Sequence, residues 1–218
     1  MYPFRQAGIS LISLMIGLLV SMIAVLGMMS LYSTVVKSTV QSTRDARIAG
    51  ERSAAILVAS KQLLGAGYGI DATRSDDLLL LTEATLALDG DRGSLSGGSV
   101  VAGNGDGNAL IWRARPDGLN SWCSGLYASP ANEQVGLYLL QPQRCGAVTE
   151  PETWEVRPLL MDNNDAADER SRLPVTISIK SEECTVFGIA GEGALYASLS
   201  TTDRTGNEVI STTCLINF

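Results

Sequence analysis

The chain has no histidine, and this absence removes much of the common catalytic and metal-binding chemistry. Without histidine there is no Ser-His or Cys-His pair to activate a nucleophile. The phosphate-binding pattern GxxxxGK[ST] is missing, and none of the cysteines stands in a C-x-x-C pair. A catalytic Ser-Lys pair has little support. Ser60-Lys61 and Lys180-Ser181 are neighbours in the sequence, but adjacent residues do not share a helix or strand face. We therefore expect no enzyme, no cofactor, no metal and no small-molecule ligand.

A second absence concerns charge, because no Asp, Glu, Lys or Arg occurs between Arg5 and Lys37. The stretch is rich in Ile, Leu, Met and Val, and about 20 such residues in a helix span the hydrocarbon core of a bilayer. Residues 9–36 are therefore predicted to form a transmembrane helix. The single leader charge, Arg5, favours a cytoplasmic N-terminus, which would place the remaining chain across the membrane.

Residues 37–66 also lack proline, so the helix is predicted to continue through them. Apolar residues recur at helical spacing on one face, while charged residues surround that face. The apolar face consists of Ile48, Ala55, Ala59 and Leu63. The charged group, which includes Arg44, Arg47 and Arg52, is expected to form a solvated or subunit-facing surface. Gly65 and Gly67 are typical of a helix end.

The start of the helix resembles a known family. The sequence Gly8-Ile9-Ser10-Leu11-Ile12 is similar to the cleavage site of type IV prepilins. In that family a prepilin peptidase cuts after the glycine and methylates the new amino terminus. The resemblance therefore implies a leader at residues 1–8, cleavage between Gly8 and Ile9, and N-methylation of Ile9. Residues 63–69 and 75–78 further resemble the helix exit and first strand of PilW-type minor pilins.

Ser13 departs from the family pattern. Pilins usually carry a glutamate at this fifth position after the cut, where its carboxylate neutralises the amino terminus of a neighbouring subunit. A buried, unpaired positive charge costs several kcal/mol, so a subunit without this carboxylate is disfavoured as a repeating unit. By resemblance to the tip-most pseudopilin of type II secretion systems, Ser13 indicates a position at or near the filament tip. Drift at a tolerant position, or a methylated terminus that is solvated in some other way, remains the alternative.

A secretory signal peptide and a plain signal anchor are the alternatives to a prepilin N-terminus. A signal peptide has an apolar region of about 7 to 15 residues followed by a small-residue cleavage site, whereas this apolar run is longer and lacks such a site. A signal anchor carrying an unrelated periplasmic domain fits the sequence better. Both alternatives still place the globular part outside the cytoplasm.

All four cysteines lie in the distal region, residues 67–218, at Cys123, Cys145, Cys184 and Cys214. An even number of cysteines in an oxidising compartment indicates disulfides, and four cysteines allow three pairings. We favour Cys123 with Cys145 and Cys184 with Cys214, because each bond would close a loop of hairpin scale and contribute about 3 kcal/mol.

Beyond the helix, the hydrophobic period shortens to that of strands separated by Gly, Asn, Asp and Pro clusters. The predicted strands are residues 78–82, 109–113, 135–141, 154–159, 175–180, 194–199 and 209–218. An antiparallel sheet packed on the amphipathic half of the helix would bury both apolar surfaces. The predicted class is thus α+β, with the long N-terminal helix and antiparallel sheet that the resemblance to type IV pilins also implies.

The segment between the first two predicted strands is rich in glycine, serine and aspartate, and is expected to be a long loop with at most a short hairpin. Its aspartates, Asp89, Asp91 and Asp106, and the acidic stretch 162–169 invite a calcium hypothesis. Neither stretch has the spacing of a calcium-binding loop, so solvated loops are the preferred interpretation.

These observations predict a minor pilin that takes part in assembly of a type IV pilus. The expected partners are other minor and major pilins, the prepilin peptidase and the inner membrane. The precursor would be single-pass with a periplasmic domain, and the mature protein would reach the cell surface in the pilus. The net charge of −7 argues against direct nucleic-acid binding. The alternatives are a minor pseudopilin of a type II secretion system and a pilus-tip adhesin.

Overall fold

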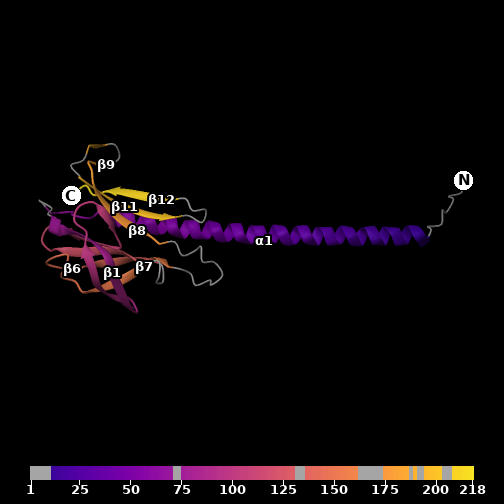
Figure 1. Cartoon of the computed structure of the whole chain (residues 1–218), viewed down its shortest axis with the longest axis horizontal. Coiled ribbons are helices and arrows are strands. Elements are labelled where there is room, and N and C mark those ends of the chain that lie inside the picture. The colour runs from indigo at the N-terminus through magenta and orange to yellow at the C-terminus, as the bar shows by residue number, and fades with distance from the viewer. Residues whose placement is uncertain are drawn as a thin grey trace. The chain divides into compact units, whose positions relative to one another are not determined.

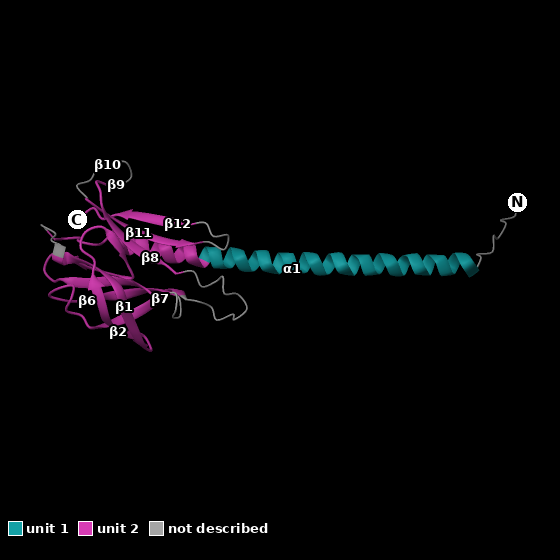
Figure 2. Cartoon of the chain, in the orientation of Figure 1, with its two compact units in different colours: residues 1–50 teal, residues 51–218 magenta. Residues whose placement is uncertain are grey.

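A computed structural model describes residues 11–70, 75–130, 136–161, 174–186, 189–190, 194–202 and 208–218 (Figure 1). The chain divides into two compact units, residues 1–50 and residues 51–218 (Figure 2). The boundary falls inside a helix, so the second unit contains the end of that helix together with the β-strands. Gly8 and Ile9 lie outside the described residues.

Helix α1 (Leu11–Leu63) is continuous over 53 residues and is long and apolar enough to cross a membrane. It ends three residues before the predicted end at residue 66. The N–H of Ala66 donates to the Leu63 carbonyl in a tight turn, and Gly67 and Gly69 follow with positive φ angles of 73°. Glycine adopts this backbone conformation without steric cost, which explains why the helix stops here.

Within the described residues, six antiparallel strands close into a barrel in the order β1-β2-β7-β6-β5-β4. Their bounds are β1 (Leu78–Asp89), β2 (Arg92–Val100), β4 (Ala109–Ala114), β5 (Trp122–Ala128), β6 (Gly136–Arg144) and β7 (Thr153–Met161). A short 3-10 helix, η1 (Ser75–Asp77), precedes β1. Closure gives every barrel strand two neighbours and removes free edges over the paired length.

Four more strands in the described part of the chain form a second antiparallel sheet in the order β12-β11-β8-β3. They are β3 (Gly105–Gly107), β8 (Thr176–Ser181), β11 (Leu195–Thr202) and β12 (Glu208–Cys214). Strands β9 (Thr185–Val186) and β10 (Ile189–Ala190) form a separate two-stranded pair. The β8–β11 and β11–β12 registers continue over six and seven residue pairs, respectively.

The α+β layout of an apolar N-terminal helix followed by antiparallel β-structure is therefore confirmed, and each of the seven predicted strand segments contains a strand. The expected arrangement as one sheet was wrong, because a closed barrel stands beside the second sheet. The segment expected to be a long loop contains β2 and β3. Strand β2 is rich in glycine and serine, and its pairing with β1 from Leu81 to Asp89 supplies the order that its own composition does not.

Two hydrophobic clusters hold the second unit together. The first joins the end of α1 to the barrel and the second sheet, and includes Ala59, Leu63, Leu110, Ile177 and Leu199. The second fills the barrel and is built around Trp154, Tyr127, Tyr138, Leu140 and Ile111. Burial of this apolar surface is the main stabilising contribution to the domain.

Candidate functional site

The first candidate site is the N-terminal part of α1. Ser13 lies in its first turns and is exposed, and the first turn contains no acidic residue. Large apolar side chains are exposed all around this part of the helix, from Leu11 to Val40. Such a surface needs a lipid or protein environment, because exposed apolar area in water is unfavourable.

Hydroxyl groups in this segment are compatible with an apolar environment, because each of the following donates to a main-chain carbonyl of its own helix. The bonds are Ser21 to Leu18 at 2.8 Å, Ser33 and Thr34 to Ser30 at 2.9 and 3.1 Å, and Thr39 to Val35 at 2.8 Å. Satisfying a hydroxyl within the helix lowers the cost of placing it in a membrane.

The last turns of α1 belong to the folded domain. Ala55, Ala59 and Leu63 are buried, as the predicted amphipathic face requires, and Ile56 is buried beside them. Arg52 was expected on a solvated or subunit-facing charged surface, and for this residue the expectation was wrong. Its side chain is 8% exposed, and its Nη1 donates to the Thr202 carbonyl of β11 at 3.0 Å. The long arginine side chain can reach a strand-end carbonyl while its aliphatic part stays packed.

The exit of α1 is tied to both β-structures of the second unit. The N–H of Gly67 donates to the Arg113 carbonyl on β4 at 2.9 Å, and the N–H of Arg115 donates to the Tyr68 carbonyl at 2.7 Å. The Asn217 amide, near the end of the chain, donates to the Ala66 carbonyl at 2.7 Å. These bonds fix where the helix enters the domain.

A buried ion pair lies beside this exit. Arg113 pairs with the Asp77 carboxylate through Nη2 and donates through Nη1 to the Gly146 carbonyl at 2.8 Å. The Asp77 side chain is almost completely buried, so loss of its partner would leave an uncompensated charge in the interior. The pair joins η1, β4 and the turn after β6, and it therefore has a structural role.

Both disulfides have the pairing favoured from the sequence. Cys123 on β5 bonds to Cys145 just after β6, and Cys184 bonds to Cys214 at the end of β12, each with a Cα–Cα distance of 5.7 Å. The sequence separations are 22 and 30 residues. The first bond secures the barrel, and the second secures the edge of the second sheet.

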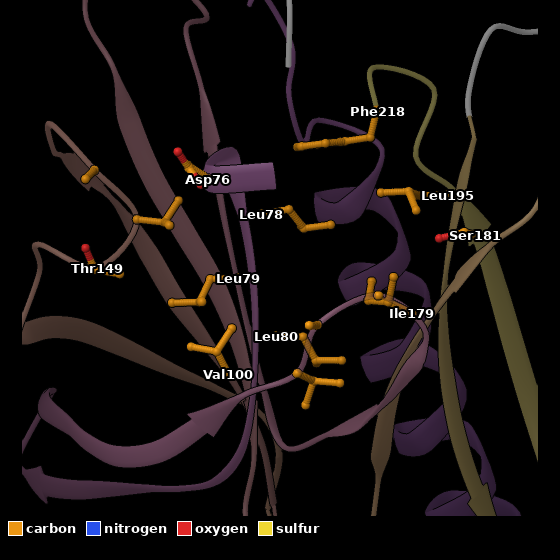
Figure 3. A pocket seen from close by; sticks show the side chains of 15 residues that line it. Asp76, Leu78, Leu79, Leu80, Val100, Thr149, Ile179, Ser181, Leu195 and Phe218 are labelled. Atoms are coloured by element: carbon orange, nitrogen blue, oxygen red, sulfur yellow. The ribbon is translucent and has the colours of Figure 1, made fainter. Parts of the chain in front are cut away.

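A groove of about 790 Å³ lies between the barrel and the second sheet (Figure 3). Leu78, Leu80, Ile179, Leu195 and Phe218 line one part of it, and their side chains are seen around the same opening. The lining is mainly aliphatic, with Asp76, Thr149 and Ser181 as its polar side chains among the described residues. This composition suits apolar contacts rather than acid–base catalysis.

No cluster of three or more metal-ligating side chains occurs among the residues that the structure describes. Asp89 and Asp91 flank the β1–β2 turn and Asp106 lies on β3, whereas the acidic stretch 162–169 is outside the described residues.

The Asp117 carboxylate accepts hydrogen bonds from the side chain and N–H of Asn120 and the N–H of Leu119, which lower its pKa to about 2. Burial raises the pKa of Tyr138.

The side-chain geometry thus identifies an exposed apolar helix and a disulfide-bonded domain in the described chain. Comparison with family models, with curated proteins and with solved structures gave no match to this chain.

Proposed function

We propose that this protein is a minor pilin that takes part in the initiation and assembly of a type IV pilus, at or near the tip. One observation carries the proposal: a single uninterrupted helix presents exposed apolar side chains over its first part and contributes Ala59 and Leu63 to the core of a disulfide-bonded β-domain over its last part. One element thereby serves both for membrane residence and for display of a folded domain.

In this proposal, prepilin peptidase cuts between Gly8 and Ile9, and the methylated Ile9 begins the mature chain. The exposed part of α1 leaves the inner membrane by packing among the helices of other minor and major pilins, which replace lipid as its apolar surroundings. Ser13 offers no carboxylate to a neighbouring amino terminus. A subunit at the tip has no further subunit to neutralise, so the missing charge is tolerated there.

A minor pseudopilin of a type II secretion system is the second candidate, and Ser13 is the observation that favours it. The tip-most pseudopilin of those systems, which this chain resembles at that position, lacks the same glutamate. The two candidates share the assembly chemistry and differ in which machine the filament belongs to. A tip adhesin would need a surface ligand in addition to assembly.

Deletion of the gene, with complementation by the wild-type chain, tests the proposal. Loss of piliation and twitching supports the type IV pilus, loss of protein secretion with normal pili supports the pseudopilus, and normal pili with lost attachment support an adhesin. Mass spectrometry of the mature chain should find a methylated Ile9 at the N-terminus. A Gly8→Val variant should keep Met1 and stay out of filaments; an intact Met1 in the wild type would overturn the pilin proposal.

The role of Ser13 has its own test. A Ser13→Glu variant should restore the carboxylate and increase incorporation along the shaft, counted by immunogold labelling of filaments. Ser13→Gln is the matched control, since it has similar size without the charge. If both variants give the same immunogold counts along the shaft as the wild type, the missing carboxylate does not determine the position of this subunit in the filament.

A further inference from the structure

Among the residues that the structure describes, the outer edge of the second sheet, at β12, has no neighbouring strand. Within the described residues β12 pairs with β11 alone, and it forms the end of the sheet (Figure 1). The N–H of Leu215 donates to the Leu195 carbonyl on the β11 side. Main-chain groups alternate in direction along a strand, so those of Ile210 and Thr212 point outward from the sheet.

Strand β12 runs alongside α1 in the same direction. The Ser60 and Ser211 hydroxyls lie 3.2 Å apart, and six residues later, just past the ends of both elements, the Asn217 amide donates to the Ala66 carbonyl. Both contacts join residues separated by 151 positions, and a constant separation means that the two segments run parallel.

The sheet covers only part of this helix. Ile56 and Leu63 are buried, whereas Leu57 is 71% exposed and Leu64 is 40% exposed. Leu57 comes three residues before Ser60. Leu64 follows the last residue of α1, and its N–H still donates to the Ser60 carbonyl at 3.1 Å. All three residues therefore lie on one side of these helical turns, next to β12. The exposed leucines are therefore continuous with the open edge.

In the described residues, this edge carries only one of the devices that usually prevent pairing with another strand, the charge of Glu208. Natural edge strands are protected by lysine, proline, bulges or a covering element. Strand β12 has neither lysine nor proline, its one charged residue is Glu208, and Ile210 on it is 56% exposed.

We propose that β12 and the adjoining leucines form a strand-addition site for an edge strand of a different subunit of the same filament. The added strand would pair with the outward main-chain groups of Ile210 and Thr212, and its side chains on the helix side would cover Leu57 and Leu64. Since side chains alternate, the partner strand is expected to be apolar at every second position, with a basic residue opposite Glu208.

A second copy of this chain fits the site poorly, for a reason that rests on the proposed function. Antiparallel pairing of two β12 strands would turn the last turns of α1, from residue 51 onward, in opposite directions, because these turns run parallel to β12 in each copy. Two copies paired in this way could not both follow one direction of the proposed filament. Parallel pairing would instead bring together two chains that each carry a net charge of −7, which repel one another.

Photo-crosslinking of the full chain in the cells that produce it tests this site. The crosslinking residue p-benzoylphenylalanine replaces Leu57, and in a control it replaces Leu119, which is 87% exposed in the β4–β5 turn. From position 57 we expect an adduct with a different polypeptide, located by mass spectrometry in a segment with alternating apolar residues. Position 119 should give no such adduct.

Ile210→Pro removes one outward N–H while leaving the bonds to β11 in place, and Ile210→Val keeps the N–H. The proline should lower the adduct yield from position 57 about tenfold, as expected for a lost hydrogen bond and a blocked edge, whereas valine should not. Ile210→Asp, which keeps the backbone donor and adds a repelling charge, should also lower the yield and serves if the proline variant unfolds.

An adduct with a second copy, with lipid alone or with the apolar helix of a partner would overturn the proposal, as would a yield that neither Ile210→Pro nor Ile210→Asp changes. The N-terminal mass is read from the same sample. A chain that is cut between Gly8 and Ile9 but gives no adduct from position 57 contradicts only the strand-addition site. A chain that keeps Met1 but still gives the adduct contradicts only the pilin proposal.

Discussion

Two leucines in the last turns of α1 provide a direct test of which helix face belongs to the domain core. Leu63 is completely buried in the cluster shared by the helix, the barrel and the second sheet, whereas Leu57 is 71% exposed. Leu63→Ala should lower the free energy of unfolding by about 3 to 4 kcal/mol, through lost burial and a residual cavity. Leu57→Ala should change it by less than about 0.5 kcal/mol, because alanine and leucine are both good helix formers.

Thermal unfolding of the full chain in detergent, followed by near-ultraviolet circular dichroism, measures this difference. For a domain of this size, Leu63→Ala should lower Tm by about 6–16 °C. The same substitution at Leu57 should leave Tm almost unchanged and should reduce assembly instead, if the strand-addition site is real. Equal loss of stability at both positions would refute the assignment of the two faces.

Three smaller changes test local features of the domain. NMR titration should find a pKa near 2 for Asp117, and Asn120→Ala should raise this pKa. Because the folded pKa is lowered, the stabilisation from the Asp117 carboxylate is present above about pH 4 and is lost as the pH falls toward 2. A wild-type Asp117 carboxyl that titrates near pH 4 would contradict this. Gly107→Ala should lower stability by about 2–3 kcal/mol in denaturant unfolding, since the new Cβ would overlap the Leu81 carbonyl oxygen, and an unchanged midpoint would show that the strands can separate. Glu83 has a positive φ of 59°, so replacement by glycine should raise Tm and replacement by valine should lower it; the opposite order would exclude backbone strain there.

The sequence predicted the features that depend on local pattern. The long helix, the burial of Ala55, Ala59 and Leu63 on its predicted face, and seven strand segments follow from hydrophobic periodicity, whereas Ile48 on that face is only half-buried and β5 in the barrel was not predicted. The favoured cysteine pairing followed from short loop lengths. Local pattern failed where distant residues decide the outcome, as in the closure of the barrel.

Two features show why other parts of the structure could not be predicted from the sequence. Arg52 is buried because a carbonyl 150 residues away accepts its hydrogen bond, and no helical pattern contains that information. Strand β2 is ordered although its composition is typical of a loop, since Asn108 binds the Ala84 main chain and thereby holds β1 where β2 pairs with it. The open edge at β12 likewise depends on which strand ends the sheet, and strand order is a property of the whole fold.

The parallel course of α1 and β12 has a consequence for the timing of folding. The cluster around Leu63 includes Leu215, so the earliest-made element of the domain waits for one of the last before its core is complete. Such long-range contacts slow folding and prolong exposure of apolar surface. With the proposed export of the domain across the membrane, the nascent chain would therefore need protection until residues 208–217 are made and the Cys184–Cys214 bond can form.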